Sequence, residues 1–571
     1  MGKKSFIRNK LFKVTITVFL ILFLVSGGVY VYLLYVPGKE IEIVEEEKEI
    51  DDRISPLTNQ AVFLEINRVR KKGIIDHMLY SGTLGNFFKS TDYQIDSNMD
   101  FLKLKMLTAL DGIRPTLKWR ETPQFSWYIT LDGYTYHLPA IYDRISWQSF
   151  ETWDTGYIDQ VWFKNVTDEN VTTTVIIDIV EPNENQGLFN RFNTDESKIF
   201  PGGEKKVLSL EFDYNFKTGR WSGDDSFNDS DGYGHCNESD YEVWFSITQT
   251  TADGDEIPWW VETNMLNSSN EVDDSKQDPD NDGVNTEWEW KWGYDPYTWE
   301  NHSSLDPDHD GIQNIEECMI SEWLSNPFYP EMYIECDWMD QTPWKPFNIN
   351  WHSADGWTHE FYEESQQMII ERFNEHGISV HIDDGCMGGG GDIIPFDKAG
   401  SEFPFGNFIQ GDGKPAEIYA KYFTEERKGI FRYVAICYKG GWCHPQDSRH
   451  CYDCVFVPHN KKFSLKTNGF AATDRTERIG IAEEIFHELG HSCGFTGNYS
   501  DGVDSKSYVI GTSPDYPWWE YVSAMNYDYY WFRYLDYSDG SHGPNDTDDW
   551  GNLNLAFFQE SSMSMEGIEG P

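Results

Sequence analysis

Hydrophobic and polar residues follow different periods in successive parts of the chain. Apolar residues recur at roughly helical spacing at 59–80, and 100–110 is a second candidate helix, so residues 56–139 are expected to be partly helical. From 140 to 263, runs rich in valine, isoleucine, threonine and aromatic residues alternate with turn clusters, which predicts strands. We expect residues 140–277 to form an all-β, sandwich-like domain followed by a polar linker.

The last part of the chain, residues 330–571, mixes the two periods. An apolar run at 331–339 predicts a strand, residues 359–377 predict an amphipathic helix ended by Gly377, and residues 378–385 predict a second strand. Such alternation favours an α+β domain in which helices pack on a sheet.

An uncharged run at 14–36 is long enough to cross a membrane as a helix. The basic tail at 1–13 precedes the run and the acidic linker at 37–55 follows it, so the expected arrangement is a single-pass anchor with a cytoplasmic N-terminus and an extracellular bulk. A cleaved signal peptide is the alternative, although no A-x-A site follows the run.

Charge restricts the partners. Acidic residues outnumber basic ones 96 to 45 among 571 residues, giving a formal net charge of −51, which argues against nucleic acid. An acidic surface without a specific partner is the plain alternative. Nine cysteines are compatible with disulfides outside the cytosol. Eight N-x-S/T sequons agree with export as a glycoprotein: Asn165, Asn170, Asn228, Asn237, Asn267, Asn301, Asn498 and Asn545.

Two near-repeats, at 278–289 and 306–317, match the twelve-residue calcium loop. Each has carboxylates at positions 1, 3 and 5, glycine at position 6 and glutamate at position 12, a spacing that wraps hard oxygen ligands around one point. The carbonyl of position 7 completes each set. The predicted ligands are Asp278, Asp280, Asp282, Val284 and Glu289 in the first loop, and Asp306, Asp308, Asp310, Ile312 and Glu317 in the second.

The form of these loops resembles thrombospondin type 3 and dockerin-like repeats. The resemblance covers about 50 residues and implies that residues 278–329 are a structural module outside the cell, holding about two calcium ions. An acidic solvated turn is the alternative.

The segment at 473–494 predicts a helix with capping signals at both ends. Asp474 and Glu477 form a capping pair, and Gly494 can close the helix in a left-handed conformation. His487 and His491 are four residues apart and so project from one face, as two ligands of one zinc ion must. Glu488 follows the first histidine, where it can act as a general base on water activated by zinc.

Beyond this helix the sequence resembles the metzincin metallopeptidases. Gly494 falls three residues after His491, and Met525 lies 34 residues after His491 in a segment like the methionine turn of that clan. The resemblance covers roughly residue 330 to the C-terminus. It implies peptide-bond hydrolysis with Glu488 as the base and Met525 as a structural residue. It also makes Tyr527 a candidate for a group beside the metal or one that stabilises the oxyanion, with an ordinary buried tyrosine as the alternative.

The third zinc ligand departs from the clan's pattern, because its usual place is taken by Gly497. Asp501 and Asp504 are the nearest carboxylates, and zinc accepts carboxylate oxygen. Asp501 lies in a Ser-Asp-Gly turn that tends to direct its side chain to its own backbone. Asp504 is therefore the predicted ligand and Asp501 the alternative. A site of another type would use a later glutamate such as Glu520.

Two further clusters of potential metal ligands each allow more than one interpretation. Cysteines and histidines gather at 437–454, where disulfides across a hairpin compete with a structural zinc site: Cys437, Cys443, His444, His450, Cys451 and Cys454. Cys493 can be paired or free. The acidic segment at 535–550 is expected to lie under the floor of the active site, with a further calcium ion as a lesser possibility.

These patterns together predict a membrane-anchored, extracellular zinc endopeptidase that acts on polypeptide. One zinc ion would be catalytic and about two calcium ions structural. The competing hypothesis is a calcium-stabilised cell-surface adhesin or structural protein whose protease-like domain is inactive. Metal analysis separates the two.

Overall fold

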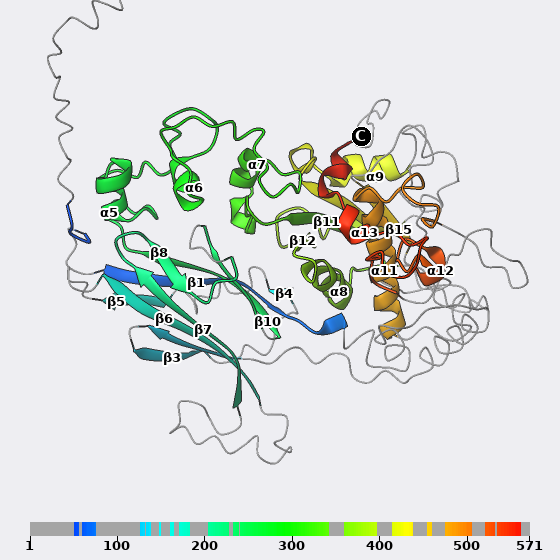
Figure 1. Cartoon of the computed structure of the whole chain (residues 1–571), viewed down its shortest axis with the longest axis horizontal. Helices are drawn as coiled ribbons and strands as arrows, with labels where there is room; N and C mark the ends of the chain where they lie inside the picture. Colours follow the sequence, from blue (N-terminus) through cyan, green and yellow to red (C-terminus); the bar gives the residue numbers. More distant parts are fainter. Residues whose placement is uncertain are drawn as a thin grey trace, which may run out of the picture. The chain divides into compact units, whose positions relative to one another are not determined.

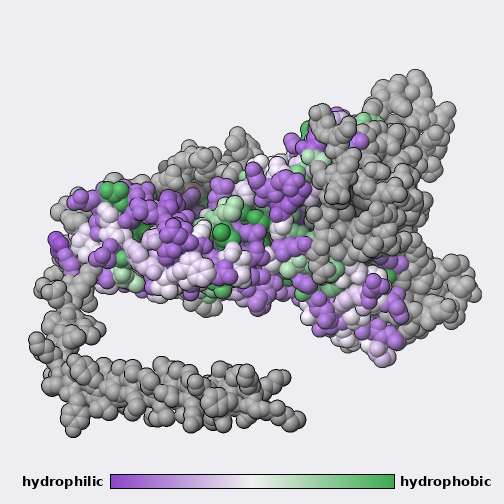
Figure 2. Space-filling view, turned by 90° about the horizontal axis from the view of Figure 1, so that it is seen from above, coloured by the Kyte–Doolittle hydropathy of each residue, from purple (hydrophilic) through white to green (hydrophobic). Residues whose placement is uncertain are grey.

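A computed structural model describes most of the chain after residue 50. The described residues are 51–55, 60–75, 126–131, 133–138, 148–149, 160–164, 171–182, 204–227, 232–238, 240–341, 359–396, 414–437, 454–458, 474–504, 520–530 and 534–560. Figure 2 shows one face, on which the described surface is mainly hydrophilic, as the acidic composition leads one to expect.

The fold class expected from the sequence is wrong in its N-terminal transmembrane helix. Within the described ranges no helix combines the length and the apolar character needed to cross a membrane. The longest, α11 (Asp474–Ser492), carries charged residues along its length. The expected span at 14–36 itself lies outside the described residues, and the described chain consists of β-sheets with comparatively few helices.

The helix expected within 59–80 is wrong for most of its described length, because residues 60–71 form the strand β1 (Gln60–Lys71) and helical backbone is described from Ile74 to Ile75. Val62, Leu64 and Ile66 alternate at strand spacing and are buried, and a register shift between Ile66 and Arg68 then moves the next buried apolar residue to Val69. This bulge converts a period of two into a spacing that imitates a helix. The second candidate helix, at 100–110, lies outside the described residues.

Two antiparallel sheets pack face to face in the first half of the described chain (Figure 1). Val62 and Val243 of one sheet share a buried cluster with Ile177 and Phe212 of the other. The first sheet has the order β4-β1-β10-β9, with β5 also paired to β1: β4 (Gln148–Ser149), β10 (Tyr241–Gln249), β9 (Gly234–Glu238) and β5 (Gln160–Lys164). The second has the order β3-β2-β6-β7-β8: β3 (Tyr134–Leu138), β2 (Ser126–Leu131), β6 (Thr172–Pro182), β7 (Glu204–Asn215) and β8 (Arg220–Gly223).

Short helices follow β10 and carry the acidic repeats. They are α5 (Trp259–Val261), the π-helical turn η1 (Glu262–Leu266), α6 (Thr286–Lys291), α7 (Asn314–Met319) and η2 (Ser321–Trp323). Trp288, Trp292 and Val284 pack with Tyr233 and Trp244 of the first sheet's region, so the first repeat is built onto the β-sheets through aromatic contacts.

The C-terminal part is a parallel sheet between helices, so it is of α/β type and not the α+β type expected. The order is β12-β11-β14-β15, with β13 also paired to β11, and every one of these pairings is parallel. Helix α8 connects β11 to β12, and a helical crossover of this kind makes neighbouring strands parallel. The strands are β11 (Glu331–Met339), β12 (Ser379–Asp383), β13 (Ile393–Ile394), β14 (Phe431–Cys437) and β15 (Cys454–Pro458).

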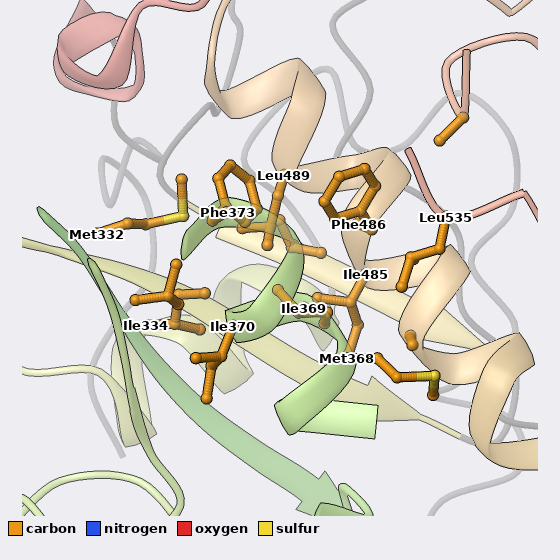
Figure 3. Packing of buried hydrophobic residues seen from close by; sticks show 14 of the residues in the cluster. Met332, Ile334, Met368, Ile369, Ile370, Phe373, Ile485, Phe486, Leu489 and Leu535 are labelled. Atoms are coloured by element: carbon orange, nitrogen blue, oxygen red, sulfur yellow. The ribbon is translucent and has the colours of Figure 1, made fainter. Parts of the chain in front are cut away.

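Two helices, α8 (Glu363–Asn374) and α11, cover one face of this sheet. Figure 3 shows Met332 and Ile334 of β11 against α8 and α11, with Phe373, Phe486 and Leu489 in the same cluster. The other face packs against α9 (Lys414–Tyr422). The remaining elements are η4 (Glu425–Arg427), α12 (Tyr527–Tyr530), α13 (Asp549–Asn552) and η6 (Leu555–Glu560). The layer under α11 fixes the helix that carries both histidines.

Candidate metal centres

The apolar face of helix α11 packs against the core, and this packing fixes the direction in which its polar side chains project. Ile485, Phe486 and Leu489 are fully buried in the sheet-facing core, and Tyr537 donates from its hydroxyl to the Phe486 carbonyl at 2.6 Å. The helix ends before Gly494, whose φ of 101° lies in the left-handed region predicted for it. His487 and His491 lie one turn apart on this fixed helix.

Both imidazoles are oriented by hydrogen bonds through Nδ1. His487 Nδ1 lies 2.8 Å from the Ala524 carbonyl oxygen, and His491 Nδ1 lies 2.6 Å from that of Phe495. A carbonyl only accepts, so Nδ1 carries a proton in each ring, and Nε2 is the nitrogen that could bind a metal. Histidines that ligate metals usually donate their other ring nitrogen to a carbonyl or carboxylate in this way.

Asp504 completes a three-residue group with the histidines. Its Oδ1 lies 3.3 Å from His487 Nε2 and 3.7 Å from His491 Nε2, and all three ligand atoms lie within 4.8 Å of one another. Two ligands bound to a tetrahedral zinc ion at ~2.0–2.2 Å are about 3.3 Å apart. The donor set and its spacing therefore fit zinc, with a fourth position left for water or substrate.

The other candidates for the third ligand lie elsewhere. Asp501 is exposed and is not in this group. Nothing lies within 4 Å of a Cβ built on Gly497. Glu520 accepts from the main-chain and side-chain nitrogens of Asn545 at 3.0 and 2.6 Å.

Met525 lies directly against α11. A Cβ built on Gly490 would be 2.3 Å from Met525 Sδ, so the absence of a side chain at 490 admits the methionine. Met525 is fully buried, and its carbonyl accepts from the Asp504 main-chain nitrogen at 3.0 Å. One segment therefore touches the helix with its side chain and holds the Asp504 loop with its backbone.

Glu488 and Tyr527 lie beside the three-residue group. Glu488 is buried, its Oε2 has no hydrogen-bond partner in the described part of the chain, and burial with the charge of Asp504 raises its pKa to about 8. Burial alone would lower the pKa of His487, but Asp504 and Glu488 raise it to about 9. Tyr527 stacks on His487 with ring centroids 5.1 Å apart, and burial and the same two carboxylates raise its pKa.

Asp549 supports the segment that contains Met525, a role that no sequence motif indicated. Its carboxylate accepts from Ser523 Oγ at 2.6 Å, from the Tyr521 hydroxyl at 3.0 Å and from the Ser538 nitrogen at 3.1 Å. Asp549 is fully buried, and burial raises its pKa to about 7 against the effect of these hydrogen bonds. Asp549 belongs to the acidic segment at 535–550, which was expected to lie under the floor of the active site.

The first acidic repeat folds as a compact loop before α6. Asp278 accepts from the main-chain nitrogens of Asn281 and Gly283 at 2.7 and 3.0 Å, and Asp282 accepts from Val284 at 3.3 Å. Asp278, Asp280 and Asp282 form a group that can hold a cation. Glu289 is fully buried, and both of its carboxylate oxygens are without hydrogen-bond partners among the described residues.

The second repeat has the same construction before α7. Asp306 accepts from Gly311 at 3.2 Å, Asp308 accepts from the Asp310 nitrogen at 3.3 Å, and Asp310 accepts from Ile312 at 2.7 Å. Glu317 is fully buried. Burial and neighbouring carboxylates raise the pKa of Asp308 to about 8 and that of Asp310 to about 7. Ionising these side chains together is therefore unfavourable without a cation, and a calcium ion would offset their charge.

His302 links the two repeats, a role that its isolated position in the sequence did not indicate. The Asn314 amide lies 3.0 Å from His302 Nδ1, and His302 Nε2 lies 3.3 Å from Asp282 Oδ2. The amide nitrogen only donates, so Nδ1 accepts and Nε2–H faces the carboxylate. The buried histidine therefore positions Asp282 of the first loop from Asn314, the ninth residue of the second.

The cysteine and histidine cluster is only partly described. Cys437 and Cys454 lie on the adjacent strands β14 and β15, and they are paired in register with Pro458 and Tyr433 respectively. The members between 443 and 451 lie outside the described residues. Cys493 forms no disulfide within the described ranges and lies buried beside Ser492.

Comparison with known proteins adds no evidence for or against the sequence motifs. No family model matches the chain, and no curated protein matches it. Among solved structures, that of Drosophila C2-DSL-EGF1 is similar at 8% identity and a TM-score of 0.17, over 34% of this chain and 68% of that one. A likeness this weak carries no argument about fold or function.

Proposed function

We propose that the C-terminal domain is a zinc-dependent endopeptidase. The observation that carries the proposal is the approach of Asp504 Oδ1 to within 3.3 and 3.7 Å of His487 Nε2 and His491 Nε2. These residues would hold the ion, with Met525 packed beneath as in the metzincins that the sequence resembles. Zinc held in this way would polarise a substrate carbonyl and lower the pKa of water to ~7.

The protein's own groups supply the proton transfers. Glu488 is buried beside His487 and has an oxygen with no hydrogen-bond partner in the described residues, so it can accept a proton from the attacking water and return it to the leaving amine. Tyr527, stacked on His487, can donate its hydroxyl proton in a hydrogen bond to the developing oxyanion. The substrate proposed is polypeptide.

The proposal includes two structural calcium ions in the repeats and an extracellular location for the bulk of the chain. Buried acidic groups in both loops support the calcium assignment, since six to eight oxygen ligands suit calcium. The sequons and the calcium loops support the location.

The test is metal content together with proteolysis of the full chain. We expect about one zinc ion per chain and cleavage that stops on chelation. Glu488→Gln should retain zinc and lose cleavage, while the exposed control Asp501→Asn should retain both. Calcium without zinc would favour the adhesin hypothesis, and cleavage by Glu488→Gln at the parent rate would remove Glu488 from the mechanism.

A further inference from the structure

A third group of carboxylates lies upstream of the two repeats, in a stretch with no calcium-loop motif. Oxygen atoms of Asp253, Asp255 and Glu262 lie within 4.8 Å of one another. Glu262 is 0% exposed and Asp255 is 7% exposed. Ser268 donates to Glu262 Oε1 at 3.3 Å and the Ile257 nitrogen to Asp255 Oδ1 at 3.0 Å. The other oxygen of each, Glu262 Oε2 and Asp255 Oδ2, is buried and has no hydrogen-bond partner among the described residues.

The backbone around this group repeats that of the two acidic loops. In each of the three segments an aspartate accepts from the main-chain nitrogen two residues later. The donors are Ile257, Val284 and Ile312, all buried. The residue before each of these aspartates has a left-handed φ: Gly254 at 94°, Asn281 at 63° and His309 at 66°.

The same correspondence extends into the helices. A helix begins four residues after the aspartate in each case, at Trp259, Thr286 and Asn314. A fully buried glutamate falls seven residues after it, as Glu262, Glu289 or Glu317. Asp253, Asp255 and Glu262 therefore occupy the third, fifth and twelfth positions of a calcium loop.

This segment differs from the calcium-loop pattern at two positions. Thr251 stands at the first position and Glu256 at the sixth, where the repeats have aspartate and glycine. Asp274 adds a carboxylate from farther along the chain: its Oδ1 is buried without a hydrogen-bond partner in the described residues. The charges of Asp253 and Asp274 act on Asp255, and those of Asp253, Asp255 and Asp274 act on Glu262.

The surroundings of the two buried carboxylates disfavour their ionised forms. Burial and neighbouring carboxylates raise the pKa of Asp255 to about 7 and that of Glu262 to about 9. The charged side chains that affect these two groups most are themselves acidic. Buried carboxylates normally pair with a cation or coordinate a metal.

We propose that Asp253, Asp255 and Glu262 bind a third calcium ion at the junction between β10 and the repeats. An all-oxygen group with several carboxylates suits this hard cation. Ile257 and Val261 pack with Trp290 of α6, so the ion would fix this turn against the first repeat. The inference goes beyond the proposed peptidase and does not depend on zinc.

The test counts calcium ions bound per full chain by equilibrium dialysis, with zinc counted separately. The parent should bind three, and Asp255→Asn with Glu262→Gln should bind two. Glu271→Gln, a nearby exposed glutamate, is the matched control and should leave three. With both repeats disabled by Asp280→Ala and Asp308→Ala, one ion should remain and should be lost when Glu262→Gln is added.

Folding is monitored by melting temperature in the same samples. Without calcium, the Asp255→Asn, Glu262→Gln variant should melt at or above the parent, because it removes buried negative charge, and calcium should then raise its melting temperature less. Equal calcium counts in the parent and this variant would overturn the inference. A parent that binds one ion and loses it with Glu262→Gln would support this site and refute the two repeats.

Discussion

The main-chain nitrogen of Asp504 donates to the carbonyl oxygen of Met525 at 3.0 Å. Asp504 adopts a left-handed φ of 56°, which is uncommon for a residue other than glycine. The hydrogen bond holds the aspartate in this conformation, from which its carboxylate reaches both histidines. The segment packed against α11 thus also fixes the loop that carries Asp504.

Asp504→Ala should weaken zinc binding of the full chain by about 100-fold or more, because even changes to residues behind a ligand typically cost 10–100-fold. Zinc affinity is measured by competition with a chromogenic chelator. Asp501→Ala is the control and should bind as the parent does, since Asp501 is exposed and outside the group. Equal affinities in the two variants would mean that Asp504 is not a ligand.

Gly490→Ala should destabilise the domain by about 1–3 kcal/mol through overpacking. The added Cβ would lie 2.3 Å from Met525 Sδ, and either the helix or the methionine must move. Denaturant unfolding gives the free energy, and zinc affinity should fall with it. Gly497→Ala, where the new Cβ meets nothing within 4 Å, should change neither quantity.

Asp549→Asn should lower stability by roughly 1–3 kcal/mol, because a buried acceptor of several hydrogen bonds loses part of its capacity. The segment with Met525 should also loosen, which would appear as faster hydrogen exchange at residues 521–526. The control is its exposed neighbour: Asp548→Asn keeps an acceptor oxygen for the hydrogen bond from the Gly551 nitrogen and should change neither stability nor exchange. Unchanged exchange in Asp549→Asn would show that Asp549 does not support this segment.

Much of α11 was predictable because its sequence signals are local: the histidine spacing and the glycine after its last turn lie close together in the chain. β1 was predicted wrongly because a bulge after Ile66 gave strand residues helical spacing. Asp549 and His302 act on residues 26 and 20 positions away in sequence, through contacts that only the fold creates. The loop at 251–262 was not predicted because two of its residues depart from the calcium-loop sequence pattern. Its likeness to the other two loops lies in the backbone, which the sequence does not display.

The ion pair of Glu242 and Arg70 should make the stability of the fold depend on pH in the acid range. Its Oε2 and Nη1 atoms are 3.0 Å apart. Burial alone would raise the pKa of Glu242, but Arg70 and His235 lower it from 4.5 to about 2. The folded state then binds fewer protons than the unfolded state, so the stabilisation is complete above pH 4.5 and is lost as pH falls toward 2.

Glu242→Gln should therefore cost ~3–5 kcal/mol at neutral pH by leaving Arg70 buried without its partner. The difference in unfolding free energy from the parent should shrink steadily below pH 4.5. The exposed control Glu238→Gln should show no such convergence. A difference that stays constant with pH would contradict the assigned cause.

Chelation of calcium should lower the melting temperature of the full chain and expose residues 278–317 to proteases. An ion at 100 times its dissociation constant stabilises the folded state by about 2.7 kcal/mol per site. Asp280→Ala and Asp308→Ala remove one loop each, and each should retain part of the calcium-induced shift while the double variant loses the share of both. His302 joins Asp282 of the first loop to Asn314 of the second, so the two losses should not be additive. Strict additivity would show that the loops bind independently, and an unchanged melting temperature after chelation would remove the calcium assignment itself.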